Sequence, residues 1–356
     1  MVPHRFGRSS PFSVGLEEEL FVVEPQTLEP APVPPGLLDG VRFKAELFRS
    51  MLELTTSVCE DVHEAVAELA GLRTEARRHV QAAGLELVAV GTWPTAVAER
   101  EEVTPKEPLL RFAEYAGSSA QRQHCAGLHV HVGVASPEEC MGRLEAVLPW
   151  LPVLLAVSAN SPYVAGRETG LASTRAELLA LLPRSGAPPV FDGYEAWSRF
   201  AESLVRLGLA DDLMRLWWDV RPHPRLGTLE VRTPDQPTRL ADTGALAAAV
   251  HALVAAADPG AQAADRAVYA QNRWAAARFG AAAGLIHPDE ERLATPAELL
   301  AELLERVEPS ARRLGSGDLL GRLDGLDQAG AQLEIGRRDG LETLFGTLVA
   351  LTYDGL

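Results

Sequence analysis

Three short segments of the chain, residues 15–23, 127–133 and 227–232, alternate polar with apolar side chains. Successive side chains of a β-strand point to opposite faces, so each segment has one apolar and one polar face. The polar members are Glu17 and Glu19, His129 and His131, and Glu230 and Arg232. If the three strands pair in one sheet, these side chains line a single site. Carboxylate and imidazole groups are ligands for divalent metal ions that hold a nucleotide phosphate.

The opposite face of the same segments predicts a hydrophobic core. Its members are Leu16, Leu20, Leu128, Val130, Leu229 and Val231. Glu18 is the exception, because the alternation places its carboxylate on the apolar face. Burying it there costs free energy unless it has a partner or lies near the sheet edge.

The bulk composition limits the classes of protein. A net charge of −16 argues against nucleic acid as a partner, which requires a basic surface. The three cysteines lack zinc-type spacing, so we expect reduced thiols and a cytoplasmic protein. No apolar signal region occupies residues 1–13, and the longest apolar stretch, residues 147–157, is short and contains two prolines. We therefore expect no membrane partner.

Strands that are polar on one face favour an α+β fold with a largely antiparallel sheet. We expect helices to cover the apolar face and the active site to occupy the polar one. No repeat or linker divides the 356 residues, so we expect a single catalytic domain, 1–356, with a helical C-terminal part at about 240–356.

Periodicity and capping signals place individual elements. The predicted strands are residues 12–23, 54–58 and 85–90. The predicted helices are residues 46–53, 61–83, 241–257 and 261–283. Two further helices are predicted to start at Ser136-Pro137 and at Thr295-Pro296. On the predicted helix 46–53, Glu46 and Glu53 are two turns apart and share a side.

Each polar pattern also has a structural interpretation without function. The glutamates would be a solvated strand edge, the histidines hydrogen-bonded core residues, and Cys125 a small core residue.

Three arginines, Arg221, Arg225 and Arg232, lie within one proline-containing segment. Their planar side chains suit bidentate binding of phosphate or carboxylate, or they pair with surface acids.

A second basic segment, residues 158–175, carries Arg167 and Arg175 and would be a substrate lid or an ordered connection. Neither a P-loop nor a dinucleotide-binding fingerprint is present in the sequence.

At these positions the chain resembles the type 2 glutamate–cysteine ligase family, also called carboxylate–amine ligases, whose fold resembles the catalytic domain of glutamine synthetase and the guanidino kinases. The matching segments are residues 14–19, 52–59, 125–133, 160–162, 166–173, 219–225, 227–232 and 272–278. They run in order over most of the chain, and together they are highly specific.

The resemblance implies ATP as a cofactor and two or more Mg²⁺ ions, or Mn²⁺. One ion would be bound by Glu17, Glu46 and Glu53, and the other by Glu19, His129 and Glu230. Arg232, Glu230 and His131 would be catalytic, and Arg232, Arg225 and Arg221 would bind the phosphates of ATP. Substrate would be bound by Arg167, Arg175, His131 and Arg221.

The resemblance also implies the reaction. The γ-carboxylate of glutamate would be phosphorylated by ATP, and an amine such as cysteine would displace the phosphate to form an amide. The identity of the amine is open at this point. A ligase that uses a different amino acid in a specialised pathway and a homo-oligomeric state are open as well. Two further alternatives are a guanidino kinase-type phosphotransferase and a binding protein without activity.

Overall fold

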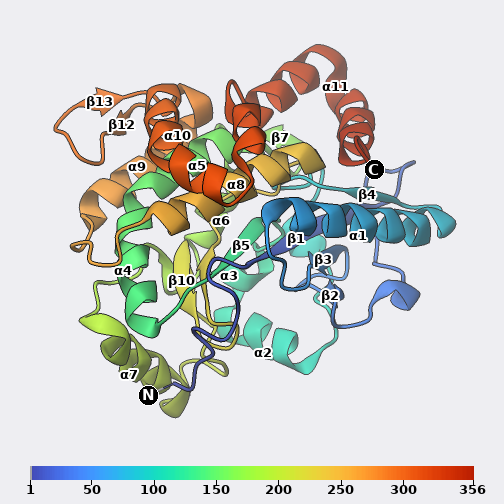
Figure 1. Cartoon of the computed structure of the whole chain (residues 1–356). Coiled ribbons are helices and arrows are strands. Elements are labelled where there is room, and N and C mark those ends of the chain that lie inside the picture. The colour runs from blue at the N-terminus through green and yellow to red at the C-terminus, as the bar shows by residue number, and fades with distance from the viewer. Residues whose placement is uncertain (1) are drawn as a thin grey trace.

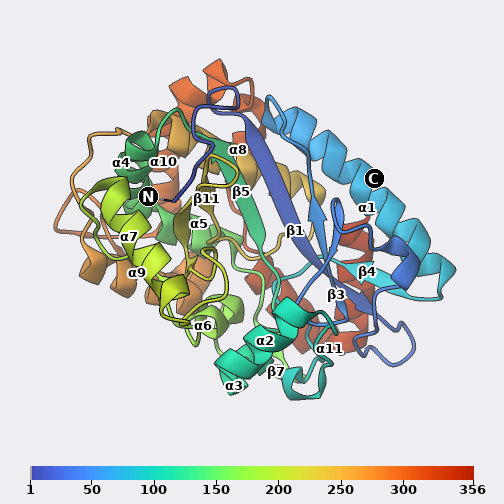
Figure 2. The same ribbon diagram turned by 90° about the horizontal axis from the view of Figure 1, so that it is seen from below.

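Seven strands form one sheet in which every neighbouring pair is antiparallel. In the computed structural model, which describes residues 2–356, the strand order is β10-β11-β5-β1-β3-β2, and β4 pairs with the C-terminal part of β1. The strands are β1 (Val14–Val23), β2 (Phe43–Ala45), β3 (Met51–Thr55), β4 (Glu86–Val88), β5 (Leu128–Gly133), β10 (Val220–His223) and β11 (Thr228–Val231). Figure 2 shows β1 and β5 side by side in the middle of the molecule.

Helices account for most of the regular structure outside this sheet. They are α1 (Val62–Ala82), α2 (Glu107–Ala116), α3 (Ser118–Gln121), α4 (Pro137–Val147), α5 (Leu151–Ser158), α6 (Thr174–Leu179), α7 (Gly193–Arg206), α8 (Leu240–Ala256), α9 (Arg266–Phe279), α10 (Pro296–Arg313) and α11 (Gln328–Thr352). Three two-stranded sheets are formed by β6 (Tyr163–Val164) with β7 (Arg167–Glu168), β8 (Ser185–Gly186) with β9 (Trp217–Trp218), and β12 (Leu285–Ile286) with β13 (Leu293–Ala294). Helices α1 and α8 pack against each other, and they contact β1 and β5 respectively. Helix α2 lies on the other side of the sheet (Figure 1).

The apolar face of the sheet is where the alternation predicted it. Leu16, Leu20, Leu128, Val130, Leu229 and Val231 are all completely buried and belong to one hydrophobic cluster. That cluster includes most of the apolar residues of α1 and α8. The period-two pattern thus fixes which face of β1, β5 and β11 lies against the helices.

Glu18 lies on this apolar face and has the partner that its burial requires. Arg73 of α1 donates two hydrogen bonds of 2.7 Å to its carboxylate, and Thr243 of α8 and Gln236 donate to the same group. Arg73 also donates to the carbonyl of Thr352 at the end of α11. Burial alone would raise the pKa of the Glu18 carboxyl, but Arg73, Thr243 and Gln236 together outweigh that effect and lower the pKa. The pair therefore connects β1 to three helices.

Most predicted elements are confirmed within a few residues. The capping residues Asp61, Ser136 and Thr295 each accept a hydrogen bond from the first turn of their helices. The predicted helix at 46–53 is wrong, because Met51–Thr55 is strand β3 and pairs with β1. Leu52 and Leu54 alternate with Glu53 and Thr55, and this period of two outweighs the helical spacing further upstream.

One stretch, residues 137–158, is long and apolar enough to cross a membrane. It comprises α4, the single turn Leu148–Trp150 and α5, and 78% of its most apolar window is buried inside the structure. Such burial is expected of helices that form part of a protein core.

We predict that Glu18→Ala lowers the free energy of unfolding by about 3–5 kcal/mol, because Arg73 is left buried without its counter-ion. Chemical denaturation of the two proteins measures the difference. Glu334→Ala is the matched control, since Glu334 forms an exposed pair with Arg338 that contributes less than about 1 kcal/mol.

The pH dependence provides a second check. A carboxyl whose pKa is lowered on folding stabilises the protein fully above its unfolded pKa, and this contribution is lost as the pH falls through the folded pKa. The difference between wild type and Glu18→Ala should therefore shrink in acid. A loss below about 1 kcal/mol at neutral pH would contradict the role given to this pair.

Candidate active site

The strand register gathers the polar side chains predicted from the sequence. Glu17 lies opposite His129, and His131 lies opposite Glu230. On the other side of β1, Glu19 lies opposite Glu53. Four neighbouring strands, β11, β5, β1 and β3, thus contribute their polar positions to one face.

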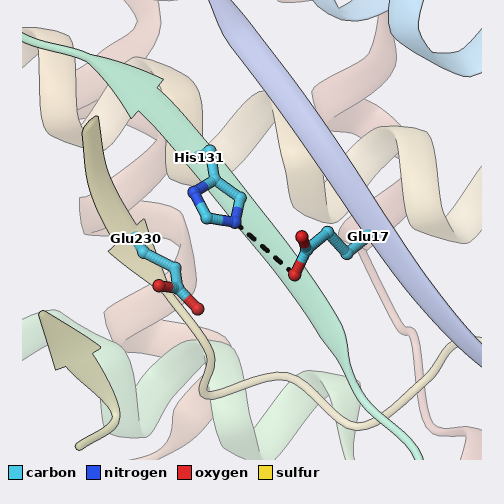
Figure 3. Close-up of side chains that lie close together, drawn as sticks. All are labelled: Glu17, His131 and Glu230. Carbon is cyan, nitrogen blue, oxygen red and sulfur yellow. Dashed lines mark ion pairs between the residues drawn. The ribbon is translucent and has the colours of Figure 1, made fainter. Parts of the chain in front are cut away.

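These side chains form two groups, and within each group the ligand atoms lie within 4.8 Å of one another. The first group is Glu17, His131 and Glu230, and the second is Glu19, Glu46 and Glu53. Figure 3 shows the first group, with the ring of His131 directed at Glu17 from the neighbouring strand; Nε2 of His131 is 3.6 Å from the carboxylate.

The two groups differ from the sets expected from the sequence. Glu17 and Glu19 have exchanged places, and His131 stands where His129 was expected. The antiparallel register explains this result, because it brings Glu19 beside Glu53 and directs Glu17 towards β5 and β11. His129 lies between the groups, with Nδ1 3.2 Å from Glu17 and Nε2 3.9 Å from Glu19.

Arginines neutralise one member of the first group. Arg221 donates from Nε and Nη2 to the two oxygens of Glu230, and Arg232 donates to the same carboxylate. Burial would raise the pKa of Glu230, but Arg221 and Arg232 outweigh it and hold the pKa well below its usual range. Glu230 is therefore an anion, fixed by a bidentate contact.

The second group has less positive charge around it. Burial, followed by the neighbouring carboxylates of Glu19 and Glu53, raises the pKa of Glu46 well above its usual range. Lys44 is 2.7 Å from Glu53 and 3.6 Å from Glu17, but it does not pair with Glu46. Three half-buried carboxylates within ligand distance repel one another, and a divalent cation would relieve that repulsion.

Two histidine nitrogens lack hydrogen-bond partners among the described residues. The Nε2 atoms of His129 and His131 are buried, and each lies within 4 Å of a glutamate oxygen without forming a hydrogen bond. Burial, followed by the charge of Arg232, lowers the pKa of His129 to about 4, so its ring is neutral at physiological pH. A neutral imidazole nitrogen beside carboxylates is suited to coordinate a metal ion.

Arg175 borders the second group and depends on a glycine for its position. Its guanidinium donates to the carbonyls of Arg232 and Thr233 and lies against Gly127. A Cβ atom on Gly127 would lie 2.1 Å from Nη2 of Arg175. The amide of Gly127 also donates a 2.6 Å hydrogen bond to Glu19. Gly127 therefore donates a hydrogen bond to the carboxylate of Glu19 and leaves room for the guanidinium of Arg175.

Two cavities adjoin the groups on different sides. The first, which we call the N-terminal cavity, has a volume of about 400 Å³ and is lined by Arg5, Arg8, Glu17, Lys44 and His131, among others. The second, the inner cavity, has a volume of about 130 Å³. Its charged and imidazole lining comprises Glu19, Glu46, His129, Arg175, Arg215 and Arg232, and the rest is Gln123, Cys125, leucines and two aromatic rings.

Two of the arginines predicted from the sequence lie outside the two groups, and a third has a supporting position. Arg167 is exposed on β7, and Arg225 pairs with Asp212. Arg221 is buried, and its third nitrogen donates to main-chain carbonyls, so it positions Glu230. The basic segment 158–175 is an ordered connection whose Ser161 and Ser173 donate to buried Asp235.

Sequence reasoning missed Lys44 and Thr228. Lys44 lies two positions before Glu46, so the alternation used for the other strands could have identified it. Thr228 forms a 3.1 Å hydrogen bond with Nδ1 of His131. It likewise lies two positions before Glu230, on the same face of β11.

Comparison with solved structures shows the same fold elsewhere. A glutamate–cysteine ligase from Francisella tularensis, in complex with AMP, superimposes with a TM-score of 0.73 over 96% of this chain and 89% of that one, at 15% identity. A bifunctional glutathione synthetase from Pasteurella multocida gives a TM-score of 0.70 over 96% of this chain and 52% of that one, at 16% identity.

Sequence comparison finds closer relatives. A Rubrobacter xylanophilus protein named "Putative glutamate–cysteine ligase 2-3" is 39% identical over 318 residues, which are 87% of each chain. A Sorangium cellulosum protein named "Putative glutamate–cysteine ligase 2" is 36% identical over 319 residues, 86% of this chain and 85% of its relative.

Fold and relatives together define an enzyme class, the ATP-dependent ligases that form carbon–nitrogen bonds. Within this class, the chain belongs to glutamate–cysteine ligase family 2, whose model matches residues 13–335.

We predict that Gly127→Ala destabilises the protein by about 1–3 kcal/mol, because the added methyl group displaces the buried Arg175 guanidinium. Thermal and urea denaturation measure this loss. Gly71→Ala is the matched control: Gly71 is exposed within α1 with free space around it, so alanine should raise stability by up to about 1 kcal/mol. Equal stability of Gly127→Ala and wild type would contradict the tight contact.

Proposed function

We propose that this protein is an ATP-dependent carboxylate–amine ligase that phosphorylates the γ-carboxylate of glutamate and transfers the acyl group to an amine. The observation that carries the proposal is the pair of ligand groups sharing strand β1. Glu17 and Glu19 belong to different groups, and the N-terminal and inner cavities adjoin the first and second group respectively. Two substrates can therefore approach a common centre from different sides.

The N-terminal cavity suits the polyphosphate of ATP. Arg5 and Arg8 are exposed at its rim, and Lys44 lies deeper, beside Glu17. Basic side chains next to a carboxylate–imidazole group provide the usual setting for a phosphate chain and its divalent ion.

The inner cavity suits the amino acid that is activated. The guanidinium groups of Arg175 and Arg232 can bind carboxylates, while the anionic lining attracts an α-ammonium group. At about 130 Å³, the cavity matches a single small acid.

The two groups fit Mg²⁺ or Mn²⁺. Glu17, His131 and Glu230 would hold one ion and Glu19, Glu46 and Glu53 the other, with His129 between them. Carboxylate and imidazole donors suit both metals, and the unpartnered histidine nitrogens and crowded carboxylates are consistent with bound cations. When bound, the ions would neutralise the negative charge of the transferring phosphoryl group.

The reaction then consists of two substitutions. An oxygen of the γ-carboxylate bonds to the γ-phosphorus of ATP while the bond to the bridging oxygen breaks, releasing ADP. The amine nitrogen next bonds to the acyl carbon, the carbon–oxygen bond to phosphate breaks, and the nitrogen loses a proton to the departing phosphate. Arg232, held between Glu230 and His129, is placed to stabilise the charge on the phosphoryl oxygens.

Cysteine is the acceptor that the names of the relatives imply. The alternative with a physical basis is a guanidino kinase-type phosphotransferase, which would use the same phosphate chemistry and release a stable phosphorylated product. The two differ in whether inorganic phosphate is released.

The test is an assay of purified protein with ATP, Mg²⁺ and glutamate, with and without hydroxylamine as a small nucleophile. We expect ADP, phosphate and glutamyl hydroxamate in equal amounts, and no hydroxamate when EDTA is added. ADP formed without phosphate would identify a kinase instead. Absence of ADP with glutamate and with other acids would identify a binding protein.

We predict that Arg232→Lys lowers kcat by about 100-fold or more, because an ammonium group cannot reproduce the planar fork that spans Glu230 and the phosphoryl group. The hydroxamate assay measures the loss, and circular dichroism verifies folding. Arg199→Lys, an exposed residue on α7 that pairs with Glu195, should keep full activity. A rate for Arg232→Lys near that of wild type would exclude phosphoryl contact.

A further inference from the structure

A third cavity adjoins the inner cavity and is not used by the proposed phosphorylation step. This outer cavity has a volume of about 370 Å³ and lies between α2 and residues 208–217. Phe112, Arg215 and Trp217 line both the inner and the outer cavity, so they form a shared wall. A molecule in the outer cavity is therefore next to the compartment that contains Glu19 and Glu46.

The sizes of the two cavities divide the substrates between them. The inner cavity, at about 130 Å³, is well below the roughly 300–1,000 Å³ typical of sites for larger ligands. An acid that fills it leaves little room for an acceptor. The outer cavity, at about 370 Å³, shares its wall and has space for one.

Aromatic rings dominate the chemistry of the shared wall. The rings of Phe112 and Trp217 are 5.1 Å apart, with planes tilted by 33°. The guanidinium of Arg215 lies 5.0 Å above Phe112, and that of Arg184 lies 5.7 Å from the centre of Trp217. Tyr115 is half exposed in the same cavity. Such a surface favours a flat, largely apolar group.

Arg184 adds an incompletely satisfied positive charge. Its Nε atom donates to the carbonyl of Arg215, but Nη2 is buried and has no hydrogen-bond partner among the described residues. Its backbone φ is +60°, a conformation that costs energy for a residue with a side chain and is often found at binding sites. Arg215, by contrast, is paired with Asp211. Arg111, the third guanidinium of this cavity, pairs with Glu107, so Arg184 is the one without an ion pair among the described residues.

We propose that the outer cavity binds the acceptor, and that the acceptor is an amino acid with an aromatic side chain rather than cysteine. This inference rests on the proposed function. The ring packs against Phe112 and Trp217, the carboxylate contacts Arg184, and the amine reaches past the shared wall to the acyl phosphate. The nitrogen bonds to the acyl carbon, and phosphate leaves with the electrons of the broken carbon–oxygen bond and takes up the surplus proton.

The experiment compares acceptors in the presence of ATP, Mg²⁺ and glutamate. Phenylalanine has both the ring and the carboxylate, alanine lacks the ring, phenethylamine lacks the carboxylate, and cysteine tests the family name. We expect kcat/KM for phenylalanine to exceed each of the other three by about tenfold or more, the effect of one aromatic or one charged contact. Hydroxylamine, as a small nucleophile, does not need the outer cavity. Hydroxamate formation therefore measures acyl phosphate formation separately from acceptor binding.

Two variants assign the contacts. Arg184→Ala should bring the ratio of kcat/KM between phenylalanine and phenethylamine close to one, whereas a purely structural defect would lower both together. Trp217→Leu should reduce the ratio between phenylalanine and alanine by about tenfold. Arg199→Ala, an exposed residue on α7, is the control and should change neither ratio.

The outcomes separate two failures. Hydroxamate formation with cysteine or alanine preferred over phenylalanine would overturn this inference and leave the proposed function intact. An unchanged ratio in Arg184→Ala would also overturn it. Absence of hydroxamate with every acid tested would overturn the proposed function, and this inference with it.

Discussion

The repulsion among five buried or half-buried glutamates on one face of a sheet is the constraint around which this protein is arranged. Each carboxylate except one has a cationic neighbour: Arg221 and Arg232 pair with Glu230, Lys44 lies between Glu17 and Glu53, and Arg175 lies beside Glu19. Glu46 forms no ion pair with a cation among the described residues, and burial together with the carboxylates of Glu19 and Glu53 raises its pKa. A cation bound at the second group, as the proposed function requires, would relieve this repulsion.

Strand β1 places consecutive glutamates in two different environments. Glu17, Glu18 and Glu19 are consecutive, yet the middle carboxylate faces the helices and the outer two face the site. Arg73 stabilises the middle one by a contact that also reaches the end of α11. The pair thereby joins the strand that carries both ligand groups to the helical layer behind it, so that the positions of Glu17 and Glu19 depend on packing on the opposite face.

Sequence reasoning could predict which side chains of β1, β5 and β11 share the polar face, because the alternation of these strands is local information. It could not predict which carboxylates meet, since Glu19 reaches Glu46 and Glu53 only through the pairing of β1 with β3, and register is a tertiary property. The helix expected at 46–53 failed for a related reason: apolar residues at helical spacing were given more weight than the alternation of Leu52 and Leu54 with Glu53. The cavities involve loops around residues 208–217, for which the sequence offers no period to follow.

The wall shared by the inner and outer cavities has a consequence for how such enzymes diversify. Phe112, Arg215 and Trp217 contact both compartments, so a substitution that reshapes one pocket also alters the other. With the acid in the inner cavity and the acceptor in the outer one, as proposed, the preferences for the two substrates should change in concert rather than one at a time. Attempts to redirect the enzyme towards a new product would then do best with libraries that vary both sides of the partition simultaneously.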